Sequence, residues 1–140
     1  MRIVVMSDSH GHYRGVHRII EANKNDTDVF IHLGDGADEF EELHQLYPHL
    51  YFIQVRGNND WGCDAPVEQL ITLGGKKILA THGHAYRVKY SLEDYEIAAQ
   101  AQEAKIALYG HTHCASIEYD DGLYIINPGS VYDSSWTPAS

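Results

Sequence analysis

The chain has 140 residues, of which 44% are hydrophobic and 21% are charged, as is typical of a globular domain. No stretch reaches the roughly 18 consecutive apolar residues of a membrane span, and the first apolar run is too short for a signal peptide, so we expect a cytoplasmic protein without membrane contacts. The net charge of −10 disfavours binding to long nucleic acids and attracts divalent cations.

The first 58 residues alternate between predicted strands and predicted helices. Three apolar runs predict buried strands, at residues 3–6, 29–33 and 51–55. Apolar residues at helical spacing predict helices over about residues 12–24 and around residues 40–47, with Pro48 closing the second. This alternation is typical of a parallel sheet.

The rest of the chain contains more strands than helices. Strands are predicted at residues 67–73, 77–80, 106–109, 117–119 and 123–126, and a helix begins near Ser91. The last two strands flank Asp120-Asp121-Gly122, which is a strong hairpin signal. We therefore expect an α/β fold in which two mixed β-sheets pack as a sandwich with helices on the outside, forming one domain over residues 1–140.

Five of the predicted strands are followed by polar residues of the kind that bind metals. The segments are Asp8-Ser9-His10, Gly34-Asp35, Gly57-Asn58-Asn59-Asp60, Thr81-His82-Gly83-His84 and Gly110-His111-Thr112-His113. Sites in open α/β sheets gather beyond the carboxyl ends of strands, and glycine leaves room for a bound ion. Each segment alone has an ordinary explanation as a turn or a helix cap, so the inference depends on the whole set.

These side chains offer carboxylate, amide and imidazole ligands without thiolate. Such ligands suit Mn²⁺, which we expect, and also iron, Ni²⁺, Zn²⁺ or Mg²⁺. Seven candidates exceed the needs of one ion with an open position, whereas two ions that share a bridging carboxylate use them all. A pair of ions can generate hydroxide and orient a phosphate ester for attack.

With this set of motifs, the sequence resembles the calcineurin-like metallophosphoesterase superfamily. The resemblance runs from residue 6 to about residue 130 and includes Asn127-Pro128-Gly129-Ser130. Within the superfamily, the sequence is most similar to small single-domain phosphodiesterases of bacteria and archaea, which also resemble a subunit of retromer. The resemblance implies the same two-sheet fold.

The resemblance also implies two divalent metal ions and a role for each candidate residue. Asp8, His10 and His113 are expected to bind the first ion, Asn58, His82 and His111 the second, and Asp35 both. A hydroxide between the ions is expected to attack phosphorus, while the metals and Asn58 steady the phosphoryl oxygens. Asp60 is expected to orient His10 or a neighbouring group.

Two features depart from the superfamily pattern. Larger members carry a histidine that protonates the leaving group where this chain has Asn59, and an amide is no general acid. His84 and His12 are the candidate replacements. The segment 134–138 does not resemble the additional C-terminal strand of relatives, so we expect that strand to be missing or divergent.

The predicted function is metal-dependent hydrolysis of a small phosphate ester, most plausibly a diester. The alternative is a catalytically weak protein-interaction scaffold of the same fold, as in the retromer subunit, although all seven ligand positions are chemically intact. A nuclease is disfavoured by the negative charge. Assembly into a homo-oligomer stays open at this point.

Overall fold

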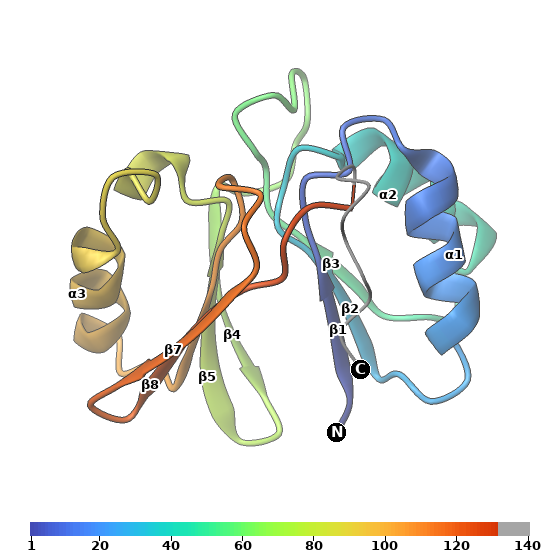
Figure 1. Ribbon diagram of the computed structural model, residues 1–140. Helices are drawn as coiled ribbons and strands as arrows, with labels where there is room; N and C mark the ends of the chain where they lie inside the picture. Colours follow the sequence, from blue (N-terminus) through green and yellow to red (C-terminus); the bar gives the residue numbers. More distant parts are fainter. Residues whose placement is uncertain (132–140) are drawn as a thin grey trace.

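The computed structural model describes residues 1–131 and shows two β-sheets packed face to face between helices. Figure 1 shows α1 and α2 on the outer side of one sheet and α3 on the outer side of the other. The order of layers is therefore helix, sheet, sheet, helix, as the sequence predicted.

The first sheet has three described strands, all parallel, in the order β1–β2–β3. They are β1 (Ile3–Met6), β2 (Val29–His32) and β3 (Phe52–Gln54). The crossovers between them are α1 (Tyr13–Asn23) and α2 (Ala37–Leu46). Every residue of β2 is buried, because helices cover one face of this sheet and the second sheet covers the other.

The second sheet is mixed and has five strands in the order β4–β5–β6–β8–β7. They are β4 (Glu68–Leu73), β5 (Lys76–Thr81), β6 (Ile106–Leu108), β7 (Ser116–Asp120) and β8 (Leu123–Asn127). β5, β6 and β8 pair in parallel, and β4 and β7 pair antiparallel at the two edges. A short 3-10 helix, η1 (His84–Tyr86), and α3 (Glu93–Ala101) lie between β5 and β6.

Three apolar cores separate the four layers. Phe30 packs with residues of α1 and α2, whereas its neighbour Ile31 packs with Ile78 of the second sheet. Tyr95 of α3 packs against Leu79 on the far face of that sheet. Successive residues of a strand point to opposite faces, so the continuous apolar runs in the sequence reflect strands that are covered on both sides.

The predicted elements all occur, with ends that differ by a few residues. The hairpin forms as expected, because Asp121 and Gly122 both adopt positive φ angles, as a two-residue type I′ turn requires. Ser91 accepts a hydrogen bond from the backbone N–H of Glu93 just before α3. The expectation about residues 134–138 lies outside the described part of the chain. Within residues 1–131, no helix has the length and apolar character that crossing a membrane requires.

Candidate metal centre

The five segments singled out in the sequence meet at one edge of the sandwich. They follow β1, β2, β3, β5 and β6, whose carboxyl ends point toward the same end of the molecule (the upper end in Figure 1). Within the first sheet the N–H of Asp8 donates to the carbonyl of Gly34, and within the second that of Gly110 donates to the carbonyl of His82. Between the sheets, the N–H of His111 donates to the carboxylate of Asp8. The fold thus brings segments up to about a hundred residues apart into one site.

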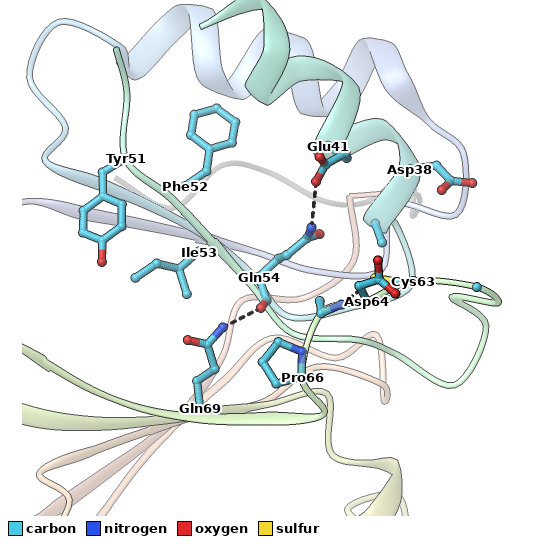
Figure 2. Close-up of a pocket in the computed structure, with 13 residues that line it drawn as sticks. Asp38, Glu41, Tyr51, Phe52, Ile53, Gln54, Cys63, Asp64, Pro66 and Gln69 are labelled. Carbon is cyan, nitrogen blue, oxygen red and sulfur yellow. Dashed lines mark hydrogen bonds between the residues drawn. The ribbon is translucent and has the colours of Figure 1, made fainter. Parts of the chain in front are cut away.

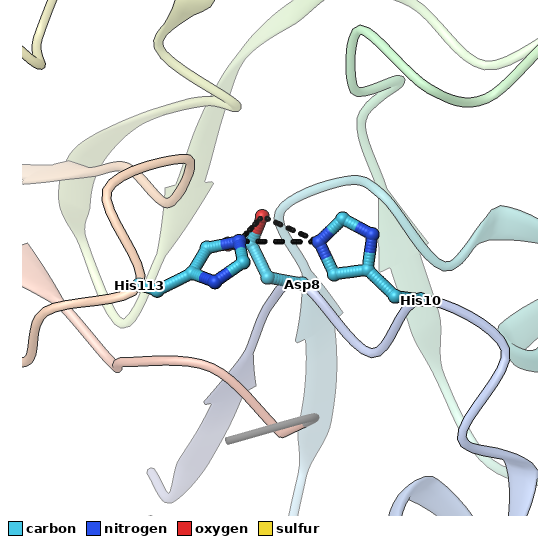
Figure 3. A group of neighbouring side chains, drawn as sticks. All are labelled: Asp8, His10 and His113. Atoms are coloured by element: carbon cyan, nitrogen blue, oxygen red, sulfur yellow. Dashed lines mark hydrogen bonds and ion pairs between the residues drawn. The ribbon is translucent and has the colours of Figure 1, made fainter.

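The first cluster of side chains consists of Asp8, His10 and His113 (Figure 3). The Nε2 atoms of His10 and His113 are 3.1 Å apart, and they lie 3.6 and 3.3 Å from Oδ1 of Asp8. Asp8 is fully buried, whereas the two histidines are partly exposed. Three ligand atoms of the expected first set therefore converge on one point.

The carboxylate of Asp8 uses its two oxygens differently. Oδ2 accepts hydrogen bonds from the hydroxyl of Ser7 at 2.6 Å and from the backbone N–H of His111 at 2.9 Å. Oδ1 is buried and accepts no hydrogen bond from any group of residues 1–131. A buried carboxylate oxygen without a donor is costly, and a bound cation is the usual partner for such an atom.

The second cluster is defined here as Asp35, His82 and His111, and the ligand atoms of Asp35 and His82 also lie within 4.8 Å of one of Asp8. Nε2 of His82 lies 3.3 Å from Oδ2 of Asp35 and 3.2 Å from Nδ1 of His111. The same oxygen of Asp35 is 3.8 Å from Nε2 of His10, so it lies between the two clusters. The carboxylate of Asp35 is thus within 4 Å of a histidine of each cluster.

Hydrogen bonding directs His82 toward the site. Its Nδ1 atom donates to the carbonyl of Leu33 at 2.8 Å, which directs Nε2 toward the carboxylate of Asp35. The hydrogen bond with Asp35 and the charges of both aspartates raise the pKa of His82, although burial acts to lower it. A cation in the cluster would take the place of that proton.

The electrostatics of the other groups also favour a cation. Burial lowers the pKa of His111 to about 4, so its ring is neutral at neutral pH and offers a lone pair. The pKa of Asp35 is well below its usual range: burial opposes this shift, but hydrogen bonds from His82 and Asn59 outweigh it. The second cluster thus holds the ionised carboxylate of Asp35 and the neutral ring of His111, and carboxylate with imidazole is a donor set that Mn²⁺, iron and Zn²⁺ accept.

The backbone is strained at the candidate ligands. Positive φ angles, which few residues other than glycine adopt, occur at Asp8, His10, Asp35, His111 and His113. Strain of this kind costs on the order of 1–3 kcal/mol per residue and collects at functional sites. The five conformations turn successive side chains toward the same point.

Two glycines make the close approach of the loops feasible. A Cβ atom at Gly57 would lie 2.2 Å from Oδ1 of Asp35, and one at Gly110 would lie 2.0 Å from the hydroxyl of Ser7 and 2.7 Å from Oδ2 of Asp8. Any side chain at either position would displace an aspartate of the cluster. This is why these two sequence motifs begin with glycine.

Asp60 organises the loop that carries Asp35. Its carboxylate accepts four backbone N–H groups at 2.8–3.1 Å, those of Asp35, Gly36, Ala37 and Gly57. Three of these donors lie at or just before the start of α2, where unpaired N–H groups favour a negative charge. These hydrogen bonds connect Asp60 to the loop of Asp35, whereas the sequence prediction named His10 or a neighbouring group as its partner.

The remaining predicted residues lie around the cluster. Asn58 is exposed on the same loop as Asn59, and the backbone and side-chain amides of Asn59 each donate to Asp35 at 2.9 Å. The ring of His84 lies 5.5 Å from that of His82 and 6.3 Å from that of His111, between ring centroids. Its Nδ1 atom is buried and has no hydrogen-bond partner within residues 1–131.

His12, the other candidate acid, is exposed and directly precedes α1. His12 is the N-cap residue of α1, which agrees with the interpretation of His12 as a surface residue at the start of a helix. Of the two candidates, His84 is the one whose ring the described structure places beside the cluster.

Sequence reasoning missed His32, a buried histidine beneath the cluster. Its Nδ1 atom accepts the N–H of Gly34 at 3.1 Å, and its Nε2 atom lies 2.9 Å from the hydroxyl of Ser9. Burial lowers its pKa to about 4. The ring therefore joins the loop of Asp8 and His10 to the loop of Asp35. Its place at the end of a continuous apolar run was the only available signal.

The Asn-Pro-Gly-Ser segment supports the cluster from the other side. The side-chain amide of Asn127 donates to the carbonyl of Gly110 at 3.1 Å and to the hydroxyl of Thr112 at 2.9 Å. The hydroxyl of Ser130 donates to the carbonyl of Asp8 at 2.8 Å. This segment fixes the loops of both clusters, although it contributes no ligand atom itself.

Comparison with known proteins identifies the family. The model of the calcineurin-like phosphoesterase superfamily domain matches residues 1–139. The chain belongs to this superfamily. It is consequently a metal-binding phosphoesterase, that is, a hydrolase, and the observed fold is the metallophosphoesterase fold.

Relatives in the calcineurin-like superfamily cover most of the chain. The probable metallophosphoesterase YsnB of Bacillus subtilis is 36% identical over 132 residues, which are 94% of this chain and 75% of YsnB. The phosphodiesterase MJ0936 of Methanocaldococcus jannaschii is 31% identical over 146 residues, covering 92% of this chain and 83% of that protein. Vacuolar protein sorting-associated protein 29 of Schizosaccharomyces pombe is 40% identical over 77 residues, 55% of this chain and 41% of that protein.

A solved structure of the superfamily superimposes on the chain. The crystal structure of a predicted phosphoesterase from Streptococcus pneumoniae is 34% identical, with a TM-score of 0.80. The match covers 91% of this chain and 71% of that one.

Proposed function

We propose that this calcineurin-like phosphoesterase is a phosphodiesterase that uses two divalent ions, with Mn²⁺ as the metal, to hydrolyse a small phosphate ester. The observation that carries the proposal is the buried Oδ1 atom of Asp8, which has no hydrogen-bond donor in residues 1–131 and faces three imidazole nitrogens. The similarity to a phosphodiesterase of M. jannaschii supports the choice of a diester.

The two clusters define the proposed ligand sets. Asp8, His10 and His113 hold one ion, Asn58, His82 and His111 hold the other, and Asp35 contacts both. Ions bound there would supply a water-derived nucleophile at neutral pH and neutralise the phosphoryl oxygens. Asn58 is exposed on its loop, from which its amide can reach a phosphoryl oxygen as well as an ion.

The surrounding residues prepare this site before the ester binds. Asp60 and Asn59 fix the loop and the carboxylate of Asp35, so little rearrangement is needed during the reaction. We assign His84 as the proton donor toward the leaving group, because its ring borders the second cluster. Burial lowers the pKa of His84, so a smaller fraction of its rings carries the proton to be donated. Esters with good leaving groups, which depend least on that proton, should therefore react fastest.

The test is reconstitution of activity by metal. Protein stripped with a chelator should not hydrolyse bis(p-nitrophenyl) phosphate, and addition of Mn²⁺ should restore turnover, measured by the release of p-nitrophenolate. Asp35→Asn should lower kcat at least about a hundredfold while the far-ultraviolet circular dichroism stays unchanged. Absence of turnover with each of Mn²⁺, Zn²⁺, Ni²⁺, Fe²⁺ and Mg²⁺ would refute the proposal.

A scaffold function is the second candidate, and the similarity to a vacuolar sorting protein of fission yeast favours it. In that case the site would bind metal without turning over a phosphate ester. Wild-type protein and Asp35→Asn would then show the same background rate with every ester offered. We rank this function second, because the structure keeps groups of side chains that could bind metal ions, as a hydrolase requires.

A further inference from the structure

A hollow of about 370 Å³ opens directly beside the metal cluster. The residues that line it include His10, Asp35, Asn59, Asp38 and Trp61. An ester whose phosphorus lies at the cluster can place one of its organic groups in this hollow, because His10 and Asp35 belong to both. The residues that line the hollow therefore influence which ester the site accepts.

Trp61 has the largest side chain among the residues that line this hollow, which we call the mouth of the site. Its side chain is 88% exposed, so the indole ring is accessible to a ligand in the hollow. It directly follows Asp60, whose carboxylate is fixed by four backbone N–H groups, so the start of the Trp61 loop is well anchored. An exposed indole beside an active centre offers a flat face that can hold a cation or an apolar group.

The charged residues of the mouth are all acidic. Asp38 and Glu39 line the hollow, and no lysine or arginine among residues 1–131 does so. Glu39 accepts a hydrogen bond from the N–H of Gly11, whereas Asp38 is exposed and forms no ion pair or hydrogen bond within the described chain. The carboxylate of Asp38 is thus available to a ligand.

A second hollow continues the same acidic surface. Its volume is about 690 Å³, and it shares Asp38 with the first. Figure 2 shows Glu41 and Asp64 on its walls, with Asp38 at its edge. Like the first hollow, it has no lysine or arginine lining it among the described residues.

We propose that this mouth binds a positively charged group of the substrate, so that the preferred ester is a phosphodiester of an amino alcohol or a quaternary ammonium alcohol. The indole of Trp61 and the carboxylate of Asp38 recognise the cation while the cluster holds the phosphate. This inference depends on the proposed phosphodiesterase function. It adds the chemical class of the ester.

The charges argue against other groups in this position. A polyphosphate would meet carboxylates with no lysine or arginine among the described lining residues, on a protein whose net charge is already −10. A neutral aromatic group could stack on Trp61 but would gain nothing from Asp38. A cation gains from both, because the face of an indole and a carboxylate each attract positive charge.

The test compares two esters that differ in one charge. One is p-nitrophenyl phosphorylcholine, and the other carries 3,3-dimethylbutanol, in which carbon replaces the cationic nitrogen. With Mn²⁺-loaded protein, we expect kcat/KM to be at least about fivefold higher for the choline ester, chiefly through KM. Salt at 1 M should reduce this ratio, because charge interactions are then screened.

Variants assign the preference to the mouth. Trp61→Ala and Asp38→Asn should each lower the ratio of the two kcat/KM values toward one, and Trp61→Phe should keep part of it. Tyr90→Ala, an equally exposed aromatic residue that does not line this hollow, should leave the ratio unchanged. A ratio near one in the wild type, or a ratio that Trp61→Ala and Asp38→Asn do not change, would overturn the inference.

The outcomes separate the two proposals. Hydrolysis of both esters at equal rates refutes the cation subsite alone. If neither ester is hydrolysed with any metal, the phosphodiesterase proposal fails, and calorimetric titration of the metal-loaded protein with glycerophosphocholine decides the subsite independently. Binding that Trp61→Ala weakens supports the subsite, and absence of binding heat overturns it.

Discussion

The unequal surroundings of the two Asp8 oxygens are the most informative feature at the scale of single residues. One oxygen is held by Ser7 and by the backbone of His111, and the other faces imidazole nitrogens without a donor from residues 1–131. A carboxylate that served only the fold would satisfy both oxygens. The second oxygen is therefore the one that we propose binds a metal ion.

Asn59 provides a test of how firmly Asp35 must be held. Asn59→Ala removes a side-chain hydrogen bond of 2.9 Å to the carboxylate of Asp35. We expect about a tenfold rise in the Mn²⁺ concentration needed for half-maximal activity, because residues that orient a ligand affect metal affinity by roughly this amount. Asn25→Ala, on the exposed surface, is the matched control. Equal metal requirements in the two variants would remove Asn59 from the positioning network.

His32 predicts how stability depends on pH in the metal-free protein. Its pKa is lowered from 6.5 to about 4 in the folded chain by burial, so the unfolded chain binds the proton more tightly between these values. Stability must therefore fall as the pH decreases from about 6.5 to 4, by up to roughly 3 kcal/mol. Urea unfolding at several pH values measures this loss. His32→Gln should lack this component, and an identical pH slope in the variant would contradict the assignment.

The residues of the candidate site were largely predictable, and their roles were less so. Aspartate, histidine and asparagine after strand ends indicated where ligands lie, because strand order converts positions in the sequence into one edge of a sheet. The role of His32 was not predictable, because a histidine at the end of an apolar run is compatible with many hydrogen-bonding partners. The role of Asp60 was not predictable for the same reason. Three of its backbone donors lie 23–25 residues earlier in the sequence, and the fourth lies in its own loop.

At the scale of elements, the site is built by turns whose conformations are strained. Five candidate ligands have positive φ angles, and these are held by hydrogen bonds between loops of different strands. The strands themselves were predictable, since both faces of β2 are covered and the apolar run is continuous. The loops were not, because left-handed conformations at aspartate and histidine depend on tertiary contacts.

Gly57 tests the close approach of two such loops. Gly57→Ala places a methyl group 2.2 Å from Oδ1 of Asp35, so we expect Asp35 to shift and unfolding free energy to fall by about 1–3 kcal/mol. Thermal unfolding and metal titration together measure both effects. At Gly62, which has a positive φ but open space around its Cβ position, alanine should add backbone strain without reducing metal affinity. The account of the loops would be wrong if Gly57→Ala bound metal as tightly as the wild type.

At the scale of the whole molecule, both sheets contribute residues to the candidate metal centre. The first sheet supplies Asp8, His10 and Asp35, and the second supplies His82, His111 and His113. Neither sheet alone completes a cluster. The first cluster needs His113 from the second sheet, and the second cluster needs Asp35 from the first sheet. The layer order was predictable from the alternation of strands and helices, whereas the packing of one sheet on the other depends on side-chain contacts that periodicity does not specify.

Metal content is the measurement that tests the central claim most directly. Protein stripped with a chelator, reloaded with Mn²⁺ and freed of excess metal should contain two ions per chain by mass spectrometry of the elements. Asp35→Asn should hold fewer than two, because this carboxylate lies between both clusters. Two saturable ions in the wild type and a lower content in the variant are the predicted result. A wild-type chain that retains no ion, or a variant that retains as many as the wild type, would contradict it.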